Sequence, residues 1–131
     1  MMVNTDYVLN VLEQTKEKEA RFFVAWKRGV ELVGGHLFGP KTTATAKIKD
    51  DLRPQHKLVE AELAKESCGE EQFLTSMVSF YSPSWGEELV EMIDCHKSFC
   101  GLTYNLDHER IEILCDLLRN FQGWPEPDGR I

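Results

Sequence analysis

Hydrophobic residues recur at helical spacing along the N-terminal quarter of the chain. With 100° per residue, ten positions between residues 8 and 33 fall within about 60° of one line on a helical wheel. A single long helix over residues 5–33 is therefore predicted, ended by Gly34 and Gly35, because glycine readily adopts the left-handed backbone that terminates helices. The ten positions are Val8, Val11, Leu12, Thr15, Glu19, Phe22, Phe23, Trp26, Val30 and Val33.

The same region allows a second interpretation. Strands at 22–26, 30–33 and 36–38, reversed at the paired glycines, would form a small hairpin within residues 20–48 and make the fold α+β. Ten positions matching one helical period favour the helix. Residues 34–53 then form a connection, in which 43–48 alternate weakly enough to suggest a short edge strand.

Four shorter helices are predicted after this connection. The first tolerates Pro54 because it falls in the opening turn. Two Ser-x-x-Glu sequences, at 67–70 and 84–87, fit the capping box that starts a helix. The last helix is stopped by Gly123 and Pro125. The predicted ranges are 52–66, 68–81, 85–100 and 107–122.

These elements predict an all-α, single-domain antiparallel helical bundle with a long N-terminal helix. The domain is expected to cover residues 1–124, followed by a frayed C-terminal tail at 125–131. The core predicted from the apolar faces consists of Val8, Leu12, Phe22, Trp26, Val30, Leu63, Phe73, Met77, Leu89, Met92, Ile93, Ile111, Leu114, Leu118 and Phe121.

Composition places the chain among small acidic globular domains. It has 131 residues, 42% of them hydrophobic, and a formal net charge of -7. A chain of this length can bury enough surface to fold without disulfides or metals. It has no apolar run of membrane-spanning length and no signal-peptide pattern, so we expect a cytoplasmic protein with reduced thiols.

The charge is unevenly distributed along the sequence. Residues 15–57 carry ten basic and five acidic side chains, whereas residues 58–131 carry five basic and fifteen acidic ones. Such blocks commonly neutralise each other within one domain, but they also permit head-to-tail docking or contact with a basic partner.

Residues 72–86 contain no charged side chain, although 28% of the chain is charged. A surface helix normally carries Lys, Glu or Arg on its outer side. One explanation is a helix packed on both sides within the chain, because small hydroxyl residues allow close approach and can bond to their own backbone. The other is an interface with a protein partner or a second copy of the chain. The interface residues predicted on that second explanation are Thr75, Ser76, Ser79, Phe80, Tyr81 and Trp85.

A metal site is the alternative functional hypothesis. His96 and Cys100 are four residues apart in one predicted helix, and the next helix offers His108 with Cys115 two turns later. Two His and two Cys on neighbouring helices would suit zinc or a small ligand. None of these spacings matches a known short metal signature, and such residues are more often found in cores.

Nucleic-acid binding is the third hypothesis. The segment from Lys41 to Lys57 is basic and rich in threonine, but it contains Asp50 and Asp51 and has no interleaved aromatic residue. Catalysis has less support, because no nucleophile elbow or phosphate-binding glycine loop is present.

The sequence therefore favours a small acidic cytoplasmic protein that acts without catalysis or cofactors, through protein–protein interaction or self-association as a homodimer. A regulatory role without membrane contact is the corresponding functional expectation.

Overall fold

The long N-terminal helix is confirmed. The computed structural model describes residues 5–65, 68–93 and 105–124, and its first element is the 29-residue helix α1 (Thr5–Val33). At its end Gly34 takes a positive φ of 132°, and its N–H donates to the Val30 carbonyl at 2.8 Å. Residues 22–26 and 30–33 lie within this helix, so the strands considered for them do not form.

A small sheet forms later in the chain. The 3-10 turn η1 (Gly35–Leu37) leads into β1 (Phe38–Pro40), and η2 (Lys49–Asp51) leads into β2 (Leu52–Pro54). The strands pair antiparallel, with Pro40 opposite Leu52 and Phe38 opposite Pro54. The predicted edge strand at 43–48 does not form; those residues are turns and loop.

Both strand prolines avoid a hydrogen-bonded position. Lys41 N–H donates to the Asp51 carbonyl, and Gln55 N–H donates to the Leu37 carbonyl. Hydrogen-bonded and non-bonded pairs alternate along an antiparallel ladder, so these two bonds identify which pairs are bonded. Pro40 and Pro54 fall at the non-bonded pairs, so their missing N–H groups cost the ladder nothing. The predicted helical start at residue 52 is wrong, because residues 52–54 pair with β1 and the next helix begins only after them.

The remaining helices lie close to their predicted positions. They are α2 (His56–Leu63), α3 (Cys68–Tyr81), α4 (Pro83–Met92) and α6 (His108–Asn120). The cap of α4 differs from the prediction, because Ser82 accepts from Trp85 N–H and Pro83 occupies the first turn. This helix also ends at Met92, where Ile93 becomes extended, while residues 94–104 lie outside the described part of the chain.

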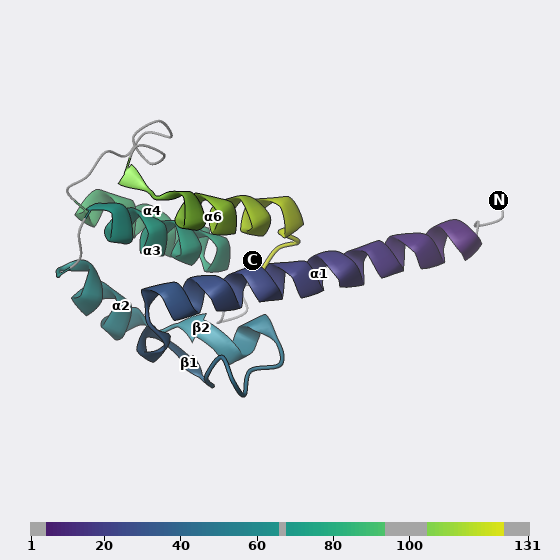
Figure 1. Ribbon diagram of the computed structural model, residues 1–131, viewed down its shortest axis with the longest axis horizontal. Helices are drawn as coiled ribbons and strands as arrows, with labels where there is room; N and C mark the ends of the chain where they lie inside the picture. The colour runs from purple at the N-terminus through teal and green to yellow at the C-terminus, as the bar shows by residue number, and fades with distance from the viewer. Residues whose placement is uncertain (1–4, 66–67, 94–104, 125–131) are drawn as a thin grey trace.

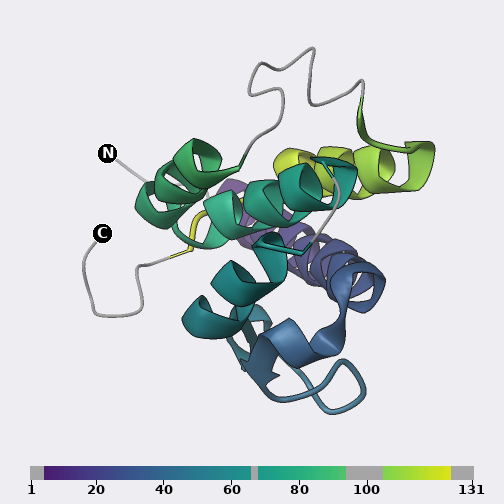
Figure 2. The same ribbon diagram turned by 90° about the vertical axis from the view of Figure 1, so that its left-hand side faces the viewer.

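The elements form two groups on either side of the C-terminal half of α1 (Figures 1 and 2). Helices α3, α4 and α6 lie on one side, and α2 with the small sheet lies on the other. Helix α6 runs antiparallel to α1, because its yellow C-terminal end points toward the N-terminal half of α1 (Figure 1). The predicted helical bundle is therefore present, with a two-stranded sheet added to it.

The core surrounds Trp26, which is fully buried and donates its indole N–H to the Leu52 carbonyl at 2.8 Å. Trp124 packs edge-on against Trp26 and donates to Asp50 Oδ1 at 2.7 Å. Trp124 is therefore anchored to the connection between the strands. The tail at 125–131 lies outside the described residues.

Five predicted core residues are instead exposed: Val8, Leu12, Met92, Leu118 and Phe121. On α6 the buried face contains Ile113 and Leu117 rather than Leu118. This amounts to a rotation by one residue, about 100° on the wheel. Val8 and Leu12 are exposed because α1 extends beyond every element that packs on it (Figure 1). No helix in the described residues has the length and apolarity needed to cross a membrane.

Candidate functional site

The N-terminal half of α1 projects from the body of the molecule (Figure 1). Every residue from 5 to 18 is exposed, whereas Glu19 is half-buried and its carboxylate lies 3.0 Å from Lys49 Nζ of the body. We call residues 5–18 the arm. At 1.5 Å per residue it is about 21 Å long.

The arm carries an uncovered apolar stripe. Val8, Val11 and Leu12 lie on the same helical line as Phe22 and Trp26, which are buried in the core. Their residue exposures are 38%, 40% and 52%. One continuous hydrophobic face is thus covered in its C-terminal half and open to solvent in its N-terminal half.

An isolated helix of this length is only marginally stable in water, and an amphipathic helix gains most of its stability by packing its apolar face. The open half of the α1 face is therefore suited to docking against another helix.

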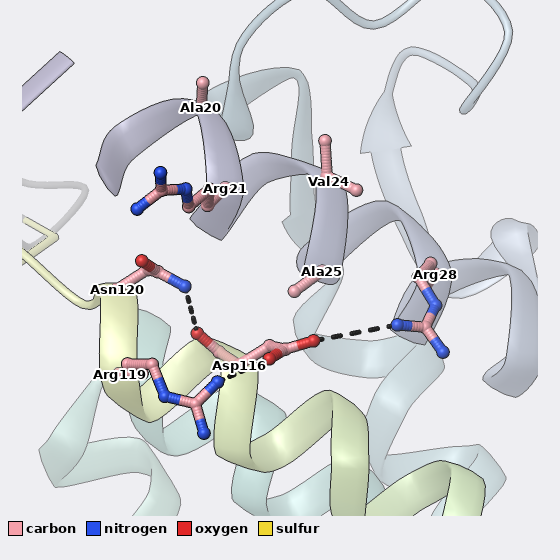
Figure 3. Close-up of a pocket in the computed structure, with 8 residues that line it drawn as sticks. All are labelled: Ala20, Arg21, Val24, Ala25, Arg28, Asp116, Arg119 and Asn120. Carbon is pink, nitrogen blue, oxygen red and sulfur yellow. Dashed lines mark hydrogen bonds and ion pairs between the residues drawn. The ribbon is translucent and has the colours of Figure 1, made fainter. Parts of the chain in front are cut away.

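A second feature is a groove between α1 and α6, with a cavity of about 480 Å³ (Figure 3). Ala25 is buried and points toward α6, and its small side chain leaves space between the helices, whereas Ala20 and Val24 line the rim with side chains that point away from α6 (Figure 3). The complete lining is Ala20, Arg21, Val24, Ala25 and Arg28 from α1, with Asp116, Arg119 and Asn120 from α6.

Asp116 joins the two sides of this groove. One of its carboxylate oxygens lies 3.7 Å from Arg28 Nη1, and the other accepts from Arg119 Nη1 at 3.0 Å. Its backbone carbonyl accepts from the Asn120 side-chain amide at 2.8 Å. Arg21 stands on the α1 side and contacts Glu17 at 3.7 Å. Two guanidinium groups therefore contact the Asp116 carboxylate, and the third, that of Arg21, contacts Glu17.

The uncharged segment is explained by packing within the chain. Gly86 of α4 approaches Ser79 of α3 so closely that a Cβ built on the glycine would lie 2.9 Å from Ser79 Cα. Ser79 Oγ donates to the Thr75 carbonyl at 3.0 Å, and Ser76 Oγ donates to the Gln72 carbonyl at 2.7 Å. Small hydroxyl side chains are thus required where α4 crosses α3.

The six predicted interface residues divide into two sets. Thr75, Tyr81 and Trp85 are buried within the chain, whereas Ser76, Ser79 and Phe80 are partly exposed. Their contact with a partner stays a prediction, but a partner is not needed to account for the missing charge.

The proposed metal ligands are only partly described. His96 and Cys100 lie outside the described residues. On α6, His108 is exposed and its Nε2 lies 3.2 Å from Glu112 Oε1, while Cys115 is exposed farther along the helix. Within the described residues, no group of three or more His, Cys, Asp or Glu is placed to hold an ion. The four-ligand zinc or small-ligand site stays a prediction.

The basic stretch from Lys41 to Lys57 is partly engaged within the chain. Lys49, only 12% exposed at its side chain, donates to the Gly123 carbonyl at 2.8 Å in addition to its contact with Glu19. Its Nζ also lies 5.3 Å from the Phe22 ring centroid. This cation therefore links the connection between the strands to α1 and to the segment that follows α6.

Asp51 stabilises the turn just before β2 through hydrogen bonds to the backbone. Its Oδ2 accepts from the backbone N–H groups of Lys47 at 2.9 Å and Ile48 at 3.3 Å. The hydrogen bond from Lys47 N–H is the main cause of a lowered pKa at Asp51, and the nearby cations Lys41 and Arg53 act in the same direction. Asp50 and Asp51, the two acidic residues within the basic stretch, thus hold this loop in place by accepting hydrogen bonds.

Sequence reasoning missed the groove. Arg21 and Arg28 are seven residues apart on one helix, a spacing that places them on the same face, but Arg119 comes from a helix at the far end of the sequence. Only the antiparallel packing of α6 on α1 brings the three arginines together.

No known protein family model matches this chain, and neither the curated proteins nor the solved structures include a detectable relative.

Proposed function

We propose that this protein acts without catalysis, by self-association through the arm of α1. The observation that carries the proposal is the exposed apolar stripe at Val8, Val11 and Leu12, which continues the core face of the same helix beyond the body. The occupant of this stripe is the arm of a second copy, so that each copy covers the other's open face.

Charge favours an antiparallel pair of arms. Lys16 and Lys18 flank the stripe on its two sides, each about 80° from its centre line. A parallel pair in register would place Lys16 of each copy beside Lys18 of the other, about 3 Å apart along the axis. In an antiparallel pair with Val11 opposite Leu12, equivalent lysines are separated by at least about 13 Å along the axis, beyond the ~8 Å Debye length at physiological salt.

The shape of the chain favours the same orientation. An antiparallel pair overlaps the two arms over their full length and leaves the two bodies at opposite ends. The contact is then isologous and closes as a two-fold dimer, as most homodimer contacts do. Val8 of each copy faces Thr15 of the other, so the stripe is covered from both ends.

The pair is expected to be weak. Covering the exposed half of one Val or Leu contributes about 1 kcal/mol, so three such residues from each copy contribute roughly 6 kcal/mol. Association itself costs about 4 kcal/mol or more. The surplus of roughly 2 kcal/mol corresponds to a dissociation constant of about 30 mM.

Sedimentation equilibrium over a concentration series up to about 5 mM tests the proposal, because a dissociation constant of about 30 mM then places roughly a fifth of the chains in dimers. The average mass should rise from 15.1 kDa toward twice that value. The double variant Val8→Gln/Leu12→Gln should stay monomeric, since glutamine keeps helix propensity but removes the apolar contact. The control Glu13→Gln changes the opposite face of the arm and should behave like the parent. A parent chain that remains monomeric throughout would refute self-association.

Orientation is tested with the variant Lys16→Glu/Lys18→Glu. In a parallel pair, an equimolar mixture of this variant with the parent would associate more tightly than either protein alone, because opposite charges would face each other. An antiparallel pair gives no such preference. Tighter mixed association would therefore overturn the antiparallel arrangement while leaving self-association standing.

A further inference from the structure

We infer that the groove between α1 and α6 is a binding site for a small organic oxyanion, a carboxylate or phosphate carried on a molecule with an apolar part. The groove lies outside the arm, so this inference is independent of self-association. Its cavity of about 480 Å³ falls in the range typical of small-ligand pockets, roughly 300–1,000 Å³.

The lining of the groove is positively charged, whereas the chain as a whole is negatively charged. The chain has a net charge of -7, yet three of the five arginines in the described residues line this cavity, with Asp116 as its only carboxylate. The lining therefore has a formal charge of +2, which falls to +1 when Glu17, 3.7 Å from Arg21, is included. Arginine is suited to this role because its planar guanidinium presents several N–H donors to a carboxylate or phosphate.

Asp116 positions two of these donors. Arg28 and Arg119 contact different oxygens of its carboxylate, at 3.7 and 3.0 Å. Each contact uses one Nη atom, so the other N–H groups of both guanidiniums remain available to a ligand. In Figure 3, Arg28 stands at one end of the groove, while Arg21 and Arg119 stand at the other, with Asp116 between Arg28 and Arg119.

The α1 side of the groove accepts an apolar group. Ala20, Val24 and Ala25 lie on the α1 side, and Val24 is 59% exposed. A ligand whose hydrocarbon part covers Val24 would place its anionic group among the arginines. The groove thus combines three apolar side chains with charged groups that can orient a ligand.

The net charge argues for a small anion rather than a nucleic acid. A small ligand experiences mainly the charges within the ~8 Å Debye length, which here are the three arginines with the carboxylates of Asp116 and Glu17 that contact them. An extended polyanion would also meet the acidic remainder of the surface, because the chain as a whole has a net charge of -7. We therefore assign the groove to a ligand that fits inside it.

The test is a two-dimensional amide NMR titration with inorganic phosphate and, separately, with a six-carbon monocarboxylate, at ionic strength held constant with chloride. Saturable shift changes confined to residues 20–28 and 116–120 are expected for both oxyanions. Tighter binding of the carboxylate would assign the natural ligand to the carboxylates with an apolar part, and tighter binding of phosphate would assign it to the phosphate esters. Shifts that increase linearly without saturation for both probes would overturn the inference.

Two variants give changes of opposite sign. Arg119→Gln should weaken binding about tenfold, because a charged donor is lost. Asp116→Asn should tighten it, because the competing carboxylate is removed. The control Arg53→Gln removes an arginine of β2 outside the groove and should leave the affinity unchanged. Equal affinities in all three variants would show that the groove does not bind the anion.

Discussion

Two buried tryptophans allow a direct measurement of what a single hydrogen bond contributes to this fold. Trp26 and Trp85 are 0% and 7% exposed. The indole N–H of Trp26 donates to the Leu52 carbonyl at 2.8 Å, whereas the indole N–H of Trp85 has no acceptor among the described residues. Replacing each by phenylalanine makes the same chemical change in two different environments.

The Leu52 carbonyl depends on Trp26 because of the strand register. Leu52 lies opposite Pro40 at a non-bonded pair, so its carbonyl points away from the ladder rather than toward β1. Leu52 is itself fully buried. Without the indole, this carbonyl would lose its acceptor role in a site that water does not reach.

The two substitutions should therefore differ in cost. Replacing Trp by Phe removes about 40 Å³ of side chain, which costs roughly 1 kcal/mol at about 24 cal/mol per Å³ of cavity. The unpaired Leu52 carbonyl adds about 1–3 kcal/mol in Trp26→Phe. Trp85→Phe adds no such term, because it removes a donor that has no described acceptor. We expect a total loss of about 2–4 kcal/mol for Trp26→Phe and about 1 kcal/mol or less for Trp85→Phe.

Urea unfolding followed by far-UV circular dichroism is the appropriate assay, since tryptophan fluorescence would itself be altered. With an m-value of about 2 kcal/mol/M, a difference of 2 kcal/mol between the variants separates their midpoints by about 1 M. Equal midpoints at unchanged m-values would refute the account, because they would show that the hydrogen bond to Leu52 contributes nothing measurable.

Two further predictions concern α4 and the loop before β2. Gly86→Ala should lower the free energy of unfolding by about 1–3 kcal/mol in the same assay, because the new methyl would collide with Ser79 and separate α4 from α3. Gly35→Ala, with no atom within 4 Å of the added carbon, should change it by less than about 0.5 kcal/mol; equal losses would contradict the close approach. Asp51→Ala should destabilise the protein near neutral pH, where the Asp51 carboxylate accepts from Lys47 N–H. Because folding lowers the pKa of Asp51, this contribution is complete above the ordinary aspartate pKa of about 4 and is lost as pH falls below it. The stability difference between parent and variant, measured by urea unfolding at several pH values, should therefore shrink in acid, and a constant difference would contradict this assignment.

The local elements were predictable because their signals lie within a few residues of one another. The helical period of α1, its glycine stop, and the start of α6 at Asp107 all follow from short-range backbone and capping preferences. The Ser/Thr-rich face of α3 likewise predicted a closely approached helix, although the sequence left open whether the neighbour was in the same chain. The structure identifies that neighbour as α4, with Gly86 against Ser79.

Only the tertiary structure showed how far the apolar stripe of α1 is buried and which distant segments of the chain come together. A hydrophobic stripe shows that a face is suited to burial, but its residues become buried only as far as neighbouring elements reach. The stripe on α1 therefore predicts Val8 and Trp26 equally well as core residues. Trp26 is buried and Val8 is exposed because the elements packed on α1 reach Trp26 but not Val8. The groove between Arg28 and Arg119 depends on contacts nearly a hundred residues apart, for which a single sequence provides no local physical signal.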